Sequence, residues 1–141
     1  MHKKAYVKIR LELVSMSKSS LDNINEVLTL LPNPNYYYLI DEIRVLEDGR
    51  VTTKPNKNTL INYTNNYTEY DVEDCNEKFL NFWNEYYDNL KKISNIFNYK
   101  ILLNYEITVY NLHYPSLIFK KKINDFISNL DIEMSFYFYN D

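Results

Sequence analysis

Apolar and polar residues alternate along three stretches of the chain, at residues 5–13, 100–110 and 132–139. In the first stretch Ala, Val, Ile and Leu occupy every second position, and mostly charged residues lie between them. A period of two residues is typical of a strand with one buried face and one face in water. We therefore predict three half-buried strands. In the last strand the residues expected inward are Ile132, Met134, Phe136 and Phe138, and those expected outward are Glu133, Ser135, Tyr137 and Tyr139.

Three other stretches, residues 19–31, 74–97 and 116–130, carry apolar residues at every third or fourth position. This is the period of a helix with one buried stripe. Ser19 is expected to cap the first helix and Asp74 the second, because short polar side chains accept hydrogen bonds from free N–H groups. The predicted stripe of the first helix is Leu21, Ile24, Val27, Leu28 and Leu31. That of the second is Phe79, Phe82, Trp83, Tyr86, Leu90, Ile93 and Ile96.

The one glycine of the chain predicts a turn. Residues 40–47 and 50–54 are expected to form a hairpin around Asp48-Gly49, because glycine adopts positive φ without strain. Residues 59–64 could form a further strand, and residues 65–66 a turn or an irregular loop.

These elements predict one α+β domain that covers residues 1–141. Because three strands alternate strictly, helices should cover only one face of the sheet. We expect a two-layer sandwich whose sheet is largely antiparallel, with the helices on one face. The order β-α-β-β-α-β is that of a ferredoxin-like core, and one further α-β unit follows it.

The charge balance of the chain bears on which kinds of partner it is expected to bind. Sixteen basic residues against nineteen acidic ones give a net charge of −3. Nucleic-acid-binding surfaces are basic and clustered, whereas the one basic run here, residues 120–122, is expected on the solvated side of a helix. We expect no nucleic-acid partner. A signal peptide or membrane span needs a longer apolar run than this sequence contains, so we expect a cytoplasmic protein with no membrane partner.

Few residues are suited to catalysis. One glycine excludes a phosphate-cradling loop and a dinucleotide fingerprint, and one cysteine excludes an internal disulfide. Cys75 and His113 could form a nucleophile and its base, but a small core residue and a solvated turn histidine explain them more simply. The acidic residues at 71–77 could bind a divalent cation, or they could compensate the dipole of a helix start. We expect no enzyme, no metal and no cofactor.

Tyrosine is the residue type that points to binding, with 15 in the chain. A codon bias toward AT-rich codons explains part of this number. The alternative is a recognition surface, because tyrosine offers a large, stiff contact area with a polar tip. An exposed aromatic patch indicates an interface with a protein partner or with a second copy of the chain. The candidate contact residues are Tyr6, Tyr36, Tyr37, Tyr38, Tyr110, Tyr137 and Tyr139, of which the three at 36–38 are expected in the connection between helix and hairpin.

Several local patterns resemble the bacterial family catalogued as domain of unknown function 4279. They are an early alternating strand, a helix that ends in Leu30-Leu31-Pro32, a Pro115-x-Leu117 pattern before the third helix, and a closing aliphatic-aromatic strand. The resemblance covers most of the chain. Residues 60–63 lack a tryptophan that the family often shows, and glycines common in the family's loops are missing.

The resemblance implies a small cytosolic α+β protein and brings no catalytic residue with it. Small domains of this kind often look like immunity proteins, which neutralise toxins by occluding an active site. We expect a non-enzymatic binding protein, of the type that inhibits a bacterial toxin. The alternative is a small-molecule-binding or regulatory domain with a pocket between sheet and helices. An enzyme that uses Cys75 or the acidic residues at 71–77 is the third reading.

Overall fold

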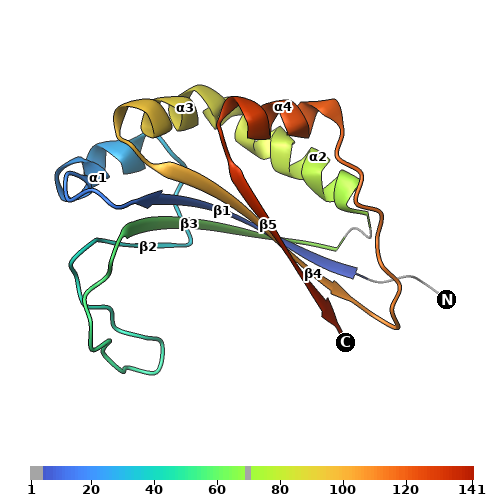
Figure 1. The fold of residues 1–141 in the computed structure, drawn as a ribbon, viewed down its shortest axis with the longest axis horizontal. Helices are drawn as coiled ribbons and strands as arrows, with labels where there is room; N and C mark the ends of the chain where they lie inside the picture. Colours follow the sequence, from blue (N-terminus) through green and yellow to red (C-terminus); the bar gives the residue numbers. More distant parts are fainter. Residues whose placement is uncertain (1–4, 69–70) are drawn as a thin grey trace.

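Strand β1 (Ala5–Ser15) lies at the centre of the sheet. The computed structural model describes residues 5–68 and 71–141, and within them five strands form one sheet in the order β2-β3-β1-β4-β5 (Figure 1). The other strands are β2 (Tyr36–Tyr38), β3 (Thr59–Tyr67), β4 (Lys100–Val109) and β5 (Glu133–Asn140). The helical elements are α1 (Ser20–Thr29), α2 (Val72–Trp83), the 3-10 turn η1 (Asn84–Tyr86), α3 (Tyr87–Ile96) and α4 (Lys121–Asn129).

The sheet is largely antiparallel, as predicted. β1 pairs antiparallel with β3 on one side and with β4 on the other, and β2 pairs antiparallel with β3. β5 lies parallel to β4, because the chain returns through α4 before it enters β5. The two-layer α+β architecture is therefore confirmed, while the ferredoxin-like character of its first part stays a prediction.

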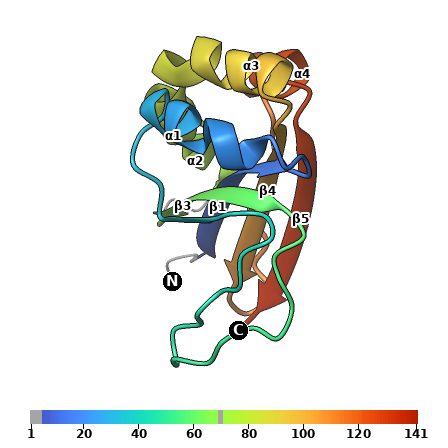
Figure 2. The same ribbon diagram turned by 90° about the vertical axis from the view of Figure 1, so that its left-hand side faces the viewer.

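The helices lie together on one face of the sheet (Figures 1 and 2). Alternate residues of β1 and β4 point toward them and form the middle of the core. Val7, Ile9, Leu11 and Leu13 in β1 are at most 1% exposed. The residues of β4 that are equally buried are Ile101, Leu103, Tyr105, Ile107 and Val109. The predicted alternation of both strands is confirmed.

Helix α1 starts where the pattern predicts, but its first turn differs from the prediction. Ser19 occupies the N-cap position, yet its side chain makes no capping hydrogen bond and instead hydrogen bonds with Ser17 Oγ at 2.7 Å. The buried residue of the first turn is Ser20, whose Oγ hydrogen bonds with Thr59 Oγ1 at 2.7 Å. Leu21, predicted inward, is 40% exposed. The reason is that Ser20 takes the position against β3.

The long helix predicted at residues 74–97 is interrupted. α2 ends at Trp83, η1 makes one tight turn, and α3 continues from Tyr87. The N-cap position belongs to Asp71 rather than Asp74. Phe82 and Ile96, predicted inward, are 45% and 63% exposed. The 3-10 turn changes the helical phase, so the apolar stripe of α2 does not continue in line into α3.

The predicted hairpin is present only as a loop. Residues 41–58, called the 41–58 loop below, contain a single bridge between Val45 and Val51 rather than two strands. Gly49 has the expected positive φ, at 85°, but the turn is longer than the predicted two residues, because the N–H of Leu46 donates to the carbonyl of Arg50. The strand that pairs at this edge of the sheet is β2, formed by residues predicted to be a connection. β2, together with Asn35 and Ile40 on either side of it, occupies the edge of β3, so the rest of the predicted hairpin does not join the sheet.

The third helix begins later than predicted, at Lys121 instead of residue 116. Before it, Phe119 packs its ring against the rings of Tyr105 and Phe136, with centroids 5.5 and 5.7 Å apart. This contact with the sheet keeps residues 113–120 out of the helix. β5 begins at Glu133 and is an edge strand, so Phe136 and Phe138 on its helix side remain 39% and 44% exposed.

One further feature concerns membranes. Within the described ranges, no helix is both long and apolar enough to cross a bilayer.

Trp83 is the largest fully buried side chain, and it packs edge-on against Tyr63 with ring centroids 4.9 Å apart. We expect Trp83→Ala to lower the free energy of unfolding by about 3–5 kcal/mol, because it removes a large buried ring and leaves a cavity. Phe82→Ala is the matched control, since that ring is the next residue but is 45% exposed. Urea unfolding followed by circular dichroism measures both. Equal losses would contradict the inward placement of Trp83.

The buried tyrosines predict alkaline unfolding. Burial raises the pKa of Tyr99 from the usual 10 to about 12, and it also raises the pKa of Tyr63 and Tyr105. A raised pKa means that the unfolded chain loses these protons first. The stability that these tyrosines contribute is therefore fully present below about pH 10 and is lost as the pH rises toward 12 and above. We expect Tyr99→Phe to make this fall shallower, measured as unfolding free energy against pH. Tyr137→Phe, on an exposed ring, controls for the loss of a hydroxyl.

Candidate protein-binding face

The face of the sheet opposite the helices is called the open face below (Figure 2). The strand register assigns to it the outward positions of the alternating strands. The strand register places Arg10 of β1 beside Thr64 of β3 and Asn104 of β4. No helix of the described chain covers this face (Figures 1 and 2). The 41–58 loop hangs from the β2 edge on the same side. The open face therefore has a wall at one edge.

A band of hydrogen-bonded polar side chains crosses the middle of the open face. Glu12 accepts a hydrogen bond from Asn62 Nδ2 at 3.0 Å and another from Asn104 Nδ2 at 3.1 Å. Thr64 Oγ1 donates to Asn62 Oδ1 at 2.7 Å, and Ser135 Oγ donates to Asn104 Oδ1. These five residues, called the polar band below, connect β3, β1, β4 and β5. Because each amide is held at both its oxygen and its nitrogen, the side chains at the centre of the open face are ordered by contacts within the chain.

A second charged group lies beside the polar band. Glu106 of β4 is 3.4 Å from Arg10 Nη2 and 3.8 Å from Lys8 Nζ. The Nε atom of Arg10 is buried and has no hydrogen-bond partner among the described residues. The guanidinium is thus only partly satisfied within the described part of the chain, although its unpaired Nε atom is buried.

The predicted tyrosines form two groups, and the first lies at the β2 edge. Tyr36 and Tyr38 face outward, since they pair with Asn62 and Leu60. Tyr37 pairs with the inward Ile61 and therefore faces the helix side of the sheet. All three line a pocket of about 820 Å³ with the 41–58 loop.

Arg44 of the loop places its guanidinium carbon 4.6 Å from the centre of the Tyr38 ring, a cation–π contact. Burial raises the pKa of Tyr38, and the charge of Arg44 opposes this rise. The loop is therefore held against the first tyrosine group.

The second tyrosine group lies at the opposite end of the open face. Tyr6 and Tyr110 meet edge-on, with ring centroids 5.9 Å apart. Tyr6 and Tyr139 line a pocket of about 400 Å³, to which the Lys8–Glu106 pair also contributes. Tyr137 is opposite Glu106 in the strand register and is 51% exposed. The structure thus brings Tyr6, Tyr110 and Tyr139 together, and it places Tyr137 beside them on β5.

Other candidates from the sequence lie elsewhere. Cys75 lies on α2 and is fully buried in the core, whereas His113 is exposed in the turn after β4. Glu73 of the acidic stretch forms an ion pair with Lys120 at 2.5 Å. In residues 5–68 and 71–141, no group of three His, Cys, Asp or Glu side chains is placed to hold a metal ion.

Sequence reasoning did not identify Asn62, Asn104 or Arg44 as part of this face. Outward polar residues in a strand are common, so no single strand distinguishes those that bond to a neighbour. The one available signal is that Asn62 interrupts an apolar run, Leu60-Ile61-Asn62-Tyr63, in a strand that proves to be interior.

Comparisons with protein-family models, with curated proteins and with solved structures found no match to this chain. The resemblance to the family of unknown function stays a prediction.

The polar band predicts a specific loss of stability. We expect Glu12→Ala to lower the free energy of unfolding by about 1–3 kcal/mol, because the fully buried amide of Asn62 loses its acceptor. Glu26→Ala, on the exposed side of α1, should change it by less than about 0.5 kcal/mol. Urea unfolding at neutral pH measures both variants. If the two losses were equal, the band would not be ordering the face.

Proposed function

We propose that this chain is a binding protein that recognises a folded protein partner through the open face. The observation that carries the proposal is the arrangement of two tyrosine groups on either side of an ordered polar band. Tyrosine and arginine are the residue types enriched where protein interfaces concentrate their binding energy.

The geometry of the face supports this function. The pockets of about 820 and 400 Å³ would each accept a side chain of the partner, and the rings that line them would supply the contact area. The backbone behind them is an ordered sheet, so little conformational entropy would be lost on binding. The polar band would offer hydrogen bonds between these two anchor points.

Within this proposal, the specific form is inhibition of a bacterial toxin by occlusion of the toxin's active site. This form rests on the resemblance to the family of unknown function. The Lys8–Glu106–Arg10 group would give the inhibitor charges of both signs at the centre of the face, which favours one partner over others more than it adds affinity.

We expect single alanine substitutions at Tyr36 or Tyr137 to weaken partner binding about 10- to 100-fold with little change in stability, because both rings are about half exposed. The partner to test is the product of a gene adjacent to the one that encodes this chain. Binding is measured by calorimetry, and protection by growth of cells in which the two proteins are expressed together. Phe82→Ala is the matched control, with similar ring exposure on the helix side.

Two results would contradict the proposal at different levels. If adjacent-gene products do not bind and none is toxic, the inhibitor form is wrong. If a partner binds but tolerates both tyrosine substitutions, the open face is not the binding surface. Sedimentation of the chain alone tests whether the same face instead holds a second copy.

A further inference from the structure

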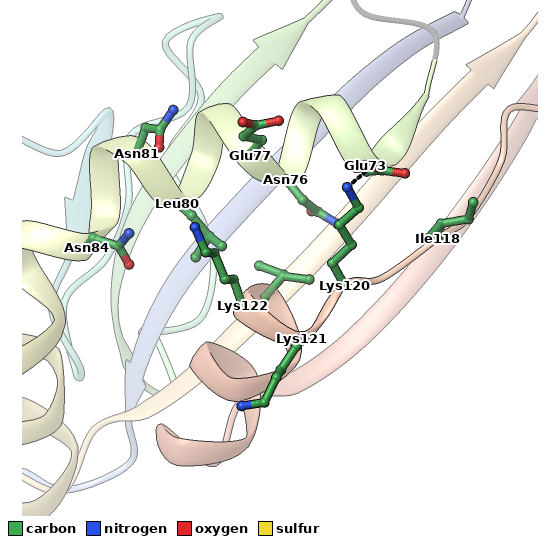
Figure 3. Close-up of a pocket in the computed structure, with 11 residues that line it drawn as sticks. Glu73, Asn76, Glu77, Leu80, Asn81, Asn84, Ile118, Lys120, Lys121 and Lys122 are labelled. Atoms are coloured by element: carbon green, nitrogen blue, oxygen red, sulfur yellow. Dashed lines mark ion pairs between the residues drawn. The ribbon is translucent and has the colours of Figure 1, made fainter.

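A groove lies on the helix side of the molecule, opposite the open face, between α2 and the start of α4 (Figure 3). Its volume is about 530 Å³, within the usual range of small-molecule pockets. Leu80 of α2, Ile118 of the preceding segment and Ile123 of α4 give it apolar walls. Charged side chains of both signs surround these walls (Figure 3). The groove thus combines an apolar interior with a charged rim.

One polar side chain in this groove has a hydrogen-bond partner at only one end, although it is almost completely buried. Asn76 is 3% exposed, and its Oδ1 atom accepts a hydrogen bond from the Tyr105 hydroxyl at 2.5 Å. Burial raises the pKa of Tyr105, so this hydroxyl keeps its proton and donates. The other end of the amide, Nδ2, has no hydrogen-bond partner within residues 5–68 and 71–141. Buried N–H donors are nearly always paired, so an unpaired one in a groove indicates a missing acceptor.

The side chain that lies next to Asn76 is a lysine on a long, exposed arm. Lys120 reaches across the groove to Glu73, at 2.5 Å, in front of Asn76 (Figure 3). The side chain of Lys120 is 69% exposed, so water screens this ion pair and the lysine can exchange one carboxylate for another. Lys121 is paired with Asp125 on its own helix, at 2.7 Å. Lys122 also lines the groove and forms no ion pair in the described part of the chain.

We propose that this groove binds a small monocarboxylate with an apolar body. One carboxylate oxygen accepts the free Nδ2 hydrogen of Asn76, and the charge is balanced by Lys122 and by Lys120, which exchanges Glu73 for the ligand. The apolar body packs against Leu80, Ile118 and Ile123. This site lies on the other side of the sheet from the protein-binding face and is independent of it.

The donor set favours an acid over other small amphipathic molecules. An amine can pair its charge with Glu77, which also lines the groove, but it would bring a donor to Asn76 Nδ2 and so would leave the buried donor unpaired. An alcohol would accept the hydrogen bond but would leave Lys122 without a counter-charge. Hydrogen bonds between charged groups are about twice as strong as those between neutral groups, so the acid should bind best.

The test is a titration of the full chain with hexanoate, hexylamine and hexanol, followed by ¹H–¹⁵N correlation spectra. We expect saturable shifts with hexanoate that are centred on Leu80, Ile118 and Ile123, and binding about tenfold weaker for hexanol. Hexylamine should bind at least tenfold more weakly than hexanoate (about 1.4 kcal/mol), because it leaves Asn76 Nδ2 unpaired even if its charge pairs with Glu77. Binding of hexylamine as tight as that of hexanoate would overturn the proposal. So would the absence of a saturable hexanoate shift up to about 10 mM.

Variants of the donor residues sharpen the test. Asn76→Asp keeps an oxygen for the Tyr105 hydroxyl but removes the donor, and we expect it to abolish hexanoate binding. Lys122→Gln changes an exposed residue, so folding should be unaffected while hexanoate binding weakens about tenfold. Lys92→Gln on α3 is the charge-matched control and should bind as the unchanged chain does. If Asn76→Asp does not fold, equal binding by Lys122→Gln and Lys92→Gln would still overturn the proposal.

Discussion

Strand β1 is the constraint on which the rest of the structure depends. It pairs along its length with β3 on one side and with β4 on the other, so both of its neighbours take their register from it. Its inward residues, from Val7 to Leu13, contact the helices, and its outward residues, from Lys8 to Glu12, hold the open face together. A slip of one residue would exchange these two sets and would bury charge in the core. The core and the open face are therefore specified by the same strand.

The sequence was sufficient to predict an element where a regular spacing of apolar residues continues over many consecutive positions. β1 and β4 were predicted almost to the residue, because ten or so alternating positions leave no other reading. β2 was missed because three tyrosines are too few to show a period and pair only through contact with β3. The break between α2 and α3 was missed for another reason. Apolar spacing continues through Tyr86, and only the packed structure shows that the buried stripe changes direction there.

For the candidate site, the alternation of inward and outward positions along the strands placed most of the tyrosines on the open face. It could not show which polar residues lie beside them. Glu12 bonds to Asn62 and to Asn104, which are 50 and 92 positions away, and this depends on the register of two separate strand pairs. The groove could not be predicted from the sequence for the same reason. Residues 120–122 read as a solvated basic run, and only the tertiary fold places them beside Asn76, whose own neighbours are acidic or apolar.

The 41–58 loop is tied to the scaffold mainly at its base. Asp41 N–H donates to the Asn56 carbonyl at 2.9 Å, and Asn56 N–H donates to that of Glu42 at 2.8 Å. These bonds close the loop where it leaves the sheet, and residues 41–51 are exposed. Mutations, insertions or deletions at its tip would then leave the core packing untouched. Such separation allows the sequence of the loop to diverge over evolutionary time while the chain keeps its ability to fold.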